Sequence, residues 1–164
     1  MQTALLDLLL IHQSAGEYAA GYRQMEKAYK AGKVRAIGLS NFNKAQIEEL
    51  LSLCEVKPTV LQTELHPYHQ EPEVKAFLKE NGIVPQAWYT LGHGDKALFQ
   101  ESLFAQLGVK YGKYAPQIIL RRNIRSSSIV IPGSKNPEHI KANFDRFDFA
   151  LTDAETVPSV DEQK

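Results

Sequence analysis

The sequence predicts an α/β fold in which about five parallel βα units form part of a (β/α)8 TIM barrel. Two observations carry this prediction. Short apolar runs alternate with stretches of helical periodicity, which is the pattern of consecutive βα units. The first four runs begin at residues 7, 35, 60 and 83, a period of about 25 residues that suits barrel repeats. Because a closed barrel of this kind has eight units, five units account for only part of one.

Taken in order, the predicted elements follow local signals. Strands are expected over residues 7–11, 35–39, 60–65, 83–88 and 128–131. The first helix is indicated by Tyr22, Met25 and Tyr29, which recur at helical spacing. The next begins after Asn43, which has Gln46 three residues later as in a capping box.

Later elements depend on Pro, Gly and charge. Pro72 suits the first turn of a helix and Gly82 suits its exit. Residues 95–122 are expected to hold one loop with a short helix, followed by a helix over 115–122. The basic patch of Arg121, Arg122 and Arg125 is expected to be a solvated face of that helix.

Composition limits the function classes. The 164 residues are 43% apolar, so we expect one folded domain over 1–155 and a polar, disordered tail over 156–164. Lys and Arg balance Asp and Glu, 19 against 19, which gives no basic excess for nucleic acid. No apolar run is long enough to span a bilayer, and no secretory signal is evident. With its single Cys54, the chain is expected to be cytoplasmic.

Polar residues stand where the predicted strands end: His12, Ser40 with Asn41, Gln62 with Glu64, Trp88 with Tyr89, and Ser134. The carboxyl ends of parallel strands meet at one rim of a barrel, where ligands bind. The alternative is that each Ser or Asn only caps the following helix. Pattern alone leaves both interpretations open.

Several segments resemble the aldo-keto reductase family in order and spacing: residues 9–12, 37–42 (IGLSNF), 62–68 (QTELHPY), 111–113 (YGK), 130–134 (VIPGS) and 143–145 (NFD). The resemblance covers about Leu5 to Asp153 and matches the carboxyl-terminal part of a family member, from about the fourth barrel strand onward. It implies an NAD(P)H-dependent oxidoreductase that reduces small aldehydes or ketones to alcohols.

The resemblance also implies a cofactor site. Ser40, Asn41 and Gln62 match the residues that bind the nicotinamide carboxamide, whose oxygen and amine a hydroxyl and two amides can satisfy. Trp88 matches the aromatic that stacks on the nicotinamide ring, although it could instead be a core residue. Further cofactor contacts are expected from Leu91, Ser134, Lys135, Asn136, His139 and Asn143.

The phosphate end departs from the family pattern. Asn136 and Pro137 are expected to cap and begin a helix whose free N–H groups suit an anion. The family usually has Lys and Arg around a 2′-phosphate where this chain has Gly133 and His139. We therefore expect either NADP or NAD as the cofactor, with the NADP preference open.

The catalytic centre also departs from the pattern. His12 matches the active-site His, but the Trp-Pro that usually follows is Gln13-Ser14. The proton donor of the family is a Tyr assisted by a Lys and an Asp, carried by earlier strands that we do not find in this chain. Neither Tyr68 nor Tyr89 matches its position. Because a positioned general acid contributes about 10²–10⁴-fold, weak or no activity is expected of this chain alone.

Three interpretations remain. The chain belongs to a working oxidoreductase whose other strands come from another chain or from a longer protein, or it is an inactive truncated remnant that binds nucleotide or has a structural role. In either case exposed strand edges favour a homo-oligomer or a complementing chain. The third interpretation is a phosphate-binding module. His66 and His69 lack a zinc-like pattern of further ligands, so no metal is expected.

Overall fold

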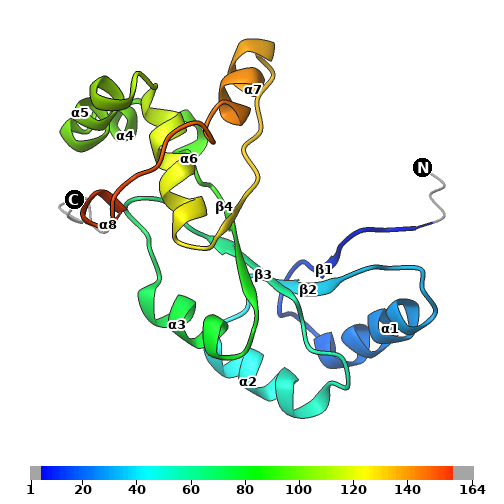
Figure 1. The fold of residues 1–164 in the computed structure, drawn as a ribbon. Coiled ribbons are helices and arrows are strands. Elements are labelled where there is room, and N and C mark those ends of the chain that lie inside the picture. The colour runs from blue at the N-terminus through cyan, green and yellow to red at the C-terminus, as the bar shows by residue number, and fades with distance from the viewer. Residues whose placement is uncertain (1–4, 157–164) are drawn as a thin grey trace. The chain divides into compact units, whose positions relative to one another are not determined.

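The structure is a computed structural model that describes residues 5–156 (Figure 1). Its strands are β1 (Leu9–Ile11), β2 (Ile37–Ser40), β3 (Val60–Glu64), β4 (Val84–Trp88) and β5 (Ile129–Val130). They form one sheet in the order β1-β2-β3-β4-β5, and the pairs β1–β2, β2–β3 and β4–β5 are parallel. All five predicted strands are therefore confirmed, each with bounds that differ by one or two residues.

Helices occupy the intervals between strands. They are α1 (Tyr18–Lys30), α2 (Lys44–Leu53), α3 (Pro72–Glu80), the 3-10 turn η1 (Gly92–Gly94), α4 (Lys96–Gln100), α5 (Ser102–Tyr111), α6 (Ala115–Arg125), α7 (Pro137–Phe144) and α8 (Asp153–Thr156). The predicted capping box is present, because the Asn43 side chain accepts from the Gln46 N–H and the Gln46 side chain accepts from the Asn43 N–H, each at 3.0 Å. Gly82, just after α3, has the positive φ of +71° that favours glycine.

The prediction for residues 95–122 was partly wrong. Two helices, α4 and α5, precede α6 where one short helix was expected. Asp95 begins α4 by accepting a hydrogen bond from the Ala97 N–H at 2.8 Å. The extended ψ of 130° at Glu101 then separates α4 from α5, and Gly112, with φ +63°, ends α5. Of the predicted tail, Thr156 instead closes α8, and the rest lies outside the described residues.

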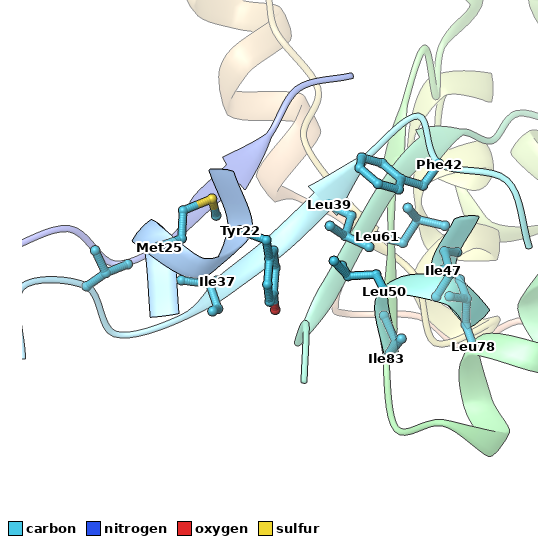
Figure 2. Close-up of a cluster of buried hydrophobic side chains, with 11 residues drawn as sticks. Tyr22, Met25, Ile37, Leu39, Phe42, Ile47, Leu50, Leu61, Leu78 and Ile83 are labelled. Carbon is cyan, nitrogen blue, oxygen red and sulfur yellow. The ribbon is translucent and has the colours of Figure 1, made fainter. Parts of the chain in front are cut away.

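The chain divides into two compact units: residues up to Thr63 with Pro72–Pro85, and Glu64–Glu71 with the residues from Gln86 onward. Figure 2 shows the core of the first unit, where side chains of α1 and α2 pack on β2 and β3. Tyr22, Ile37 and Ile47 are fully buried there, each stabilising the fold by about 1.5–3 kcal/mol. Cys54 packs against this core. The prediction of one domain over 1–155 stays a prediction.

The second unit has its own core, formed by Leu98, Phe104, Leu107, Ile118, Ile119 and Leu151.

The prediction that Arg122 lies on a solvated helix face was wrong, because Arg122 is only 5% exposed. Its Nε donates to the Thr156 carbonyl at 2.9 Å and its Nη2 to Gln70 Oε1 at 2.7 Å, and burial lowers the pKa of its guanidinium. Arg125 is exposed as expected and pairs with Asp153 at 2.6 Å. Among residues 5–156, no helix is long and apolar enough to cross a membrane.

Candidate functional site

In the first unit, the ends of β1, β2 and β3 bring four predicted site residues together. Ser40 pairs with Gln62 in register, and the Asn41 N–H donates to the Gln62 carbonyl at 2.9 Å. The Asn41 Nδ2 donates to Ser40 Oγ at 3.1 Å and to the His12 carbonyl at 3.2 Å. These four residues, Ser40, Asn41, Gln62 and His12, are called the amide cluster below.

The amide cluster combines buried and accessible groups. Ser40 is 1% exposed, Asn41 and Gln62 are half-buried, and His12 is exposed. Asn41 has a left-handed φ of +58°, which Asn adopts more readily than most residues. A hydroxyl and two side-chain amides at neighbouring strand ends are the donor and acceptor types that a planar carboxamide requires.

Gly38 makes this arrangement possible, a role that was not predicted from the sequence. A Cβ built on Gly38 would lie 2.5 Å from the Val60 carbonyl oxygen and 2.8 Å from Leu10 Cδ2. The close approach of β2 to β3 therefore requires glycine two residues before Ser40. A glycine inside an apolar strand is the sequence signal that could have indicated it.

The second unit contains a groove with a volume of about 1250 Å³, larger than the roughly 300–1,000 Å³ of sites for drug-sized ligands. Five predicted cofactor-binding residues line it: Trp88, Leu91, Ser134, His139 and Asn143. Lys135 and Asn136 do not line it. Further lining residues, which the sequence analysis did not single out for binding, include Tyr89, His93, Lys96, Gln117 and Lys141. We call this feature the long groove.

The predicted phosphate end of the long groove has the expected helix start. Asn136 caps α7, because its Oδ1 accepts from the Glu138 N–H at 3.0 Å. The Asn136 N–H donates to Ser134 Oγ at 3.1 Å, which leaves the Ser134 hydroxyl proton able to donate. The first N–H groups and the dipole of α7 favour an anion here. On the lining, Lys141 adds a positive charge and Glu138, in the first turn of α7, a negative one.

Two salt bridges hold the chain next to Asn143, which is 7% exposed. Lys113, whose side chain is 8% exposed, donates to Asp145 Oδ2 at 2.9 Å and to Asp148 Oδ2 at 2.8 Å. These bonds raise the pKa of Lys113 and lower that of Asp148. Gln117 also donates to Asp145. The segments 111–113 and 143–145, which are distant in the sequence, therefore meet, and Asn143 and Asp145 of the second segment line the groove.

Trp88, the last residue of β4, is half-buried. The next residue, Tyr89, has a left-handed φ of +61°, which costs roughly 1–3 kcal/mol for a residue other than glycine. The Tyr89 ring packs edge-on against His93, with centroids 4.3 Å apart, and its centroid lies 5.8 Å from that of Trp88. These ring contacts offset the backbone strain.

His66 and His69 each lie beside a carboxylate. The His66 Nε2 is 3.0 Å from Glu64 Oε1, and the His69 Nε2 is 2.8 Å from Glu71 Oε1. In the part of the chain that the structure describes, no group of three or more His, Cys, Asp or Glu residues is arranged to hold a metal ion.

Comparison with known proteins identifies the family. The model of the "Aldo/keto reductase family" matches residues 1–163. Glyoxal reductase of Bacillus subtilis is 39% identical over 153 residues, which cover 93% of this chain and 55% of that protein. The chain spans about half the length of the curated relatives it matches.

Solved structures agree with this match. An aldo/keto reductase from Brucella melitensis superposes with a TM-score of 0.87 at 36% identity, over 94% of this chain and 59% of that one. Bombyx mori aldo-keto reductase in complex with NADP gives a TM-score of 0.85 at 30% identity, over 93% and 56%. The five parallel βα units thus correspond to part of a (β/α)8 barrel, and the chain belongs to the aldo/keto reductase family.

Proposed function

We propose that this chain binds NADPH or NADH and forms the cofactor-binding half of a reductase for small aldehydes and ketones. The observation that carries the proposal is the long groove, because Trp88, Leu91, Ser134, His139 and Asn143 line one continuous surface. A dinucleotide needs such an extended site, with an aromatic surface for one base and hydrogen-bond donors for phosphate.

Each part of the site has a proposed role. Trp88 stacks on the nicotinamide ring, which contributes about 0.5–1.5 kcal/mol beyond area burial. Ser40, Asn41 and Gln62 of the amide cluster bind its carboxamide. Ser134 and the start of α7, with Lys135 and Asn136 nearby, bind phosphate.

The remaining roles concern the adenine end and the substrate. Asn143 contacts adenine, and Leu91 packs against the cofactor. His139 faces the groove where a permanent cation would favour a 2′-phosphate, so both NADPH and NADH are expected to bind. His12 orients the substrate carbonyl.

We further propose that the proton donor lies outside these 164 residues. The support is that neither candidate tyrosine matches the family's donor. Tyr68 is also a poor acid, because burial and its hydrogen bond to Glu101 raise its pKa to about 12. On this proposal the isolated chain oxidises NADPH slowly or undetectably when glyoxal is added, and a robust rate would contradict it.

The sole tryptophan gives a direct binding test. Emission from Trp88 is followed during titration with NADPH and with NADH, with free tryptophan as the control for light absorption by the cofactor. We expect saturable quenching by both. Ser134→Ala should weaken binding, whereas the matched variant Ser52→Ala, on the outer helix α2, should not. Absence of saturable quenching at millimolar cofactor would overturn the proposal.

A second candidate, an oligomeric nucleotide-binding or structural remnant, is supported by the sheet edges. Among the described residues, β1 and β5 each pair on one side only. Apolar side chains are exposed at both, including Leu6 at 40% and Ile131 at 48%, and such edges tend to associate. Light scattering is expected to report a species larger than the monomer. A monodisperse monomer together with glyoxal reduction would contradict this candidate.

A further inference from the structure

One histidine, His66, contacts a lining residue of the long groove without lining the groove itself. The His66 side chain is 12% exposed, and His66 is not a lining residue of the groove. Its Nε2 lies 3.0 Å from Glu64 Oε1. Because an ionised carboxylate only accepts hydrogen bonds, Nε2 carries the proton in this contact. Nδ1 is buried and has no hydrogen-bond partner among the described residues, so the contact with Glu64 is made through Nε2.

The backbone around His66 is fixed as well. The His66 and His69 backbones exchange two hydrogen bonds, of 3.0 and 2.9 Å, across a tight turn. The preceding residue, Leu65, donates its N–H to the Trp88 carbonyl at 3.2 Å. His66 is therefore held on a segment that is bonded directly to the strand end that carries Trp88.

The His66 ring contacts Tyr89, one of the residues with a left-handed backbone. Its centroid lies 5.3 Å from that of Tyr89, with an interplanar angle of 61°. Tyr89 has the strained left-handed φ of +61° and also packs against His93 at 4.3 Å and Trp88 at 5.8 Å. Tyr89, His93 and Trp88 all line the groove, whereas His66 supports Tyr89 without lining it.

We propose that His66 is a positioning residue. Its ring, oriented by Glu64, holds Tyr89 in the left-handed conformation and thereby fixes the orientation of Trp88 toward the cofactor ring. The proposal rests on the function proposed above for Trp88. It goes beyond that function, because it assigns a role to a side chain that does not line the groove.

Loss of the His66 ring is expected to change the quenching amplitude of Trp88 and the affinity for the cofactor to different extents. Loss of the His66 ring removes one of the ring contacts of Tyr89, so the orientation of Trp88 becomes less uniform. The contacts expected of Ser134 and Asn143 with the rest of the cofactor do not change. Quenching of Trp88 at saturating cofactor should therefore fall much more than the affinity does.

The test measures Trp88 quenching by NADPH at saturation, the dissociation constant, and the near-ultraviolet circular dichroism of the aromatic rings. In His66→Ala we expect the quenching amplitude to fall to less than half of wild type, with the dissociation constant changed only a few-fold. His66→Gln retains an N–H donor for Glu64 and should recover part of the amplitude. The matched control is His69→Ala, because His69 also pairs with a carboxylate, Glu71, in the same turn.

The outcomes are distinct. Wild-type amplitude in His66→Ala, or an equal loss in His69→Ala, would overturn the positioning role. If His66→Ala does not fold, Tyr89→Gly tests the same link, since glycine accepts the left-handed φ but lacks the ring. Tyr89→Gly should reproduce the loss of amplitude without a loss of thermal stability, and unchanged amplitude would refute the inference. Absence of quenching in the wild-type protein would instead refute the proposed function.

Discussion

Replacing Gly38 by alanine tests how tightly β2 is packed in the sheet. The new Cβ would lie 2.5 Å from the Val60 carbonyl oxygen, on β3, and 2.8 Å from Leu10 Cδ2, on β1. Leu10 can rotate, but the carbonyl oxygen belongs to the backbone of a paired strand, so β2 and β3 must move apart. Overpacking of this kind costs about 1–3 kcal/mol. We place Gly38→Ala toward the upper end of that range, because both neighbouring strands are affected.

Urea unfolding followed by far-ultraviolet circular dichroism measures the free energy of unfolding. The matched control is Gly133→Ala, because a Cβ at Gly133 meets no atom within 4 Å and its φ is not in the left-handed region. We expect a clear loss of stability for Gly38→Ala and almost none for Gly133→Ala. Equal unfolding midpoints for the two variants would refute the steric reasoning.

Two further predictions concern carboxylates. Glu26 is 6% exposed and accepts hydrogen bonds from the N–H groups of Glu55 and Val56 at 2.7 and 2.8 Å. Glu26→Ala should therefore destabilise the protein by about 1–3 kcal/mol for each N–H left unpaired. Urea unfolding measures this loss, and an unchanged unfolding midpoint would contradict the prediction. Glu155 has its pKa lowered from 4.5 to about 2, chiefly by its hydrogen bond to Lys110. The contribution of Glu155 to the free energy of unfolding is therefore present above pH 4.5 and is lost as the pH falls toward 2. In Glu155→Gln the free energy of unfolding should fall less steeply between pH 4.5 and 2 than in the wild type. An unaltered pH dependence would contradict this prediction.

Much of the fold could be predicted from the sequence because its signals are local. The strand at Ile37–Ser40 is indicated by its own apolar residues. The helix after Asn43 is indicated by a capping box that spans only four residues. The helix after Asn136 follows in the same way, since a cap and Pro137 stand together. Each signal depends on neighbours in the chain and not on the rest of the fold.

The features that could not be predicted depend on contacts between distant residues. Arg122 belongs to a basic run, yet it is buried because Gln70 and the Thr156 carbonyl, both far away in sequence, satisfy its guanidinium. The contact of His66 with Tyr89 joins residues on two successive βα units. The boundary between α4 and α5 depends on the backbone angle of Glu101, for which the sequence has no Gly or Pro signal.

The candidate site also has features that could be predicted from the sequence and features that could not. Its strand-end residues Ser40 and Trp88 could be identified from pattern and resemblance. The long groove could not, because Lys96 and Gln117 reach it from helices α4 and α6. A groove is a property of packed side chains, and periodicity in the sequence does not specify it.

The most direct test of the central claim is a nuclear magnetic resonance titration of the ¹⁵N-labelled protein with NADPH. The claim is that the residues lining the long groove bind the cofactor. We predict that the Trp88 indole N–H and the side-chain amide of Asn143 shift together with a single dissociation constant. No shift at either group at millimolar NADPH would contradict the claim.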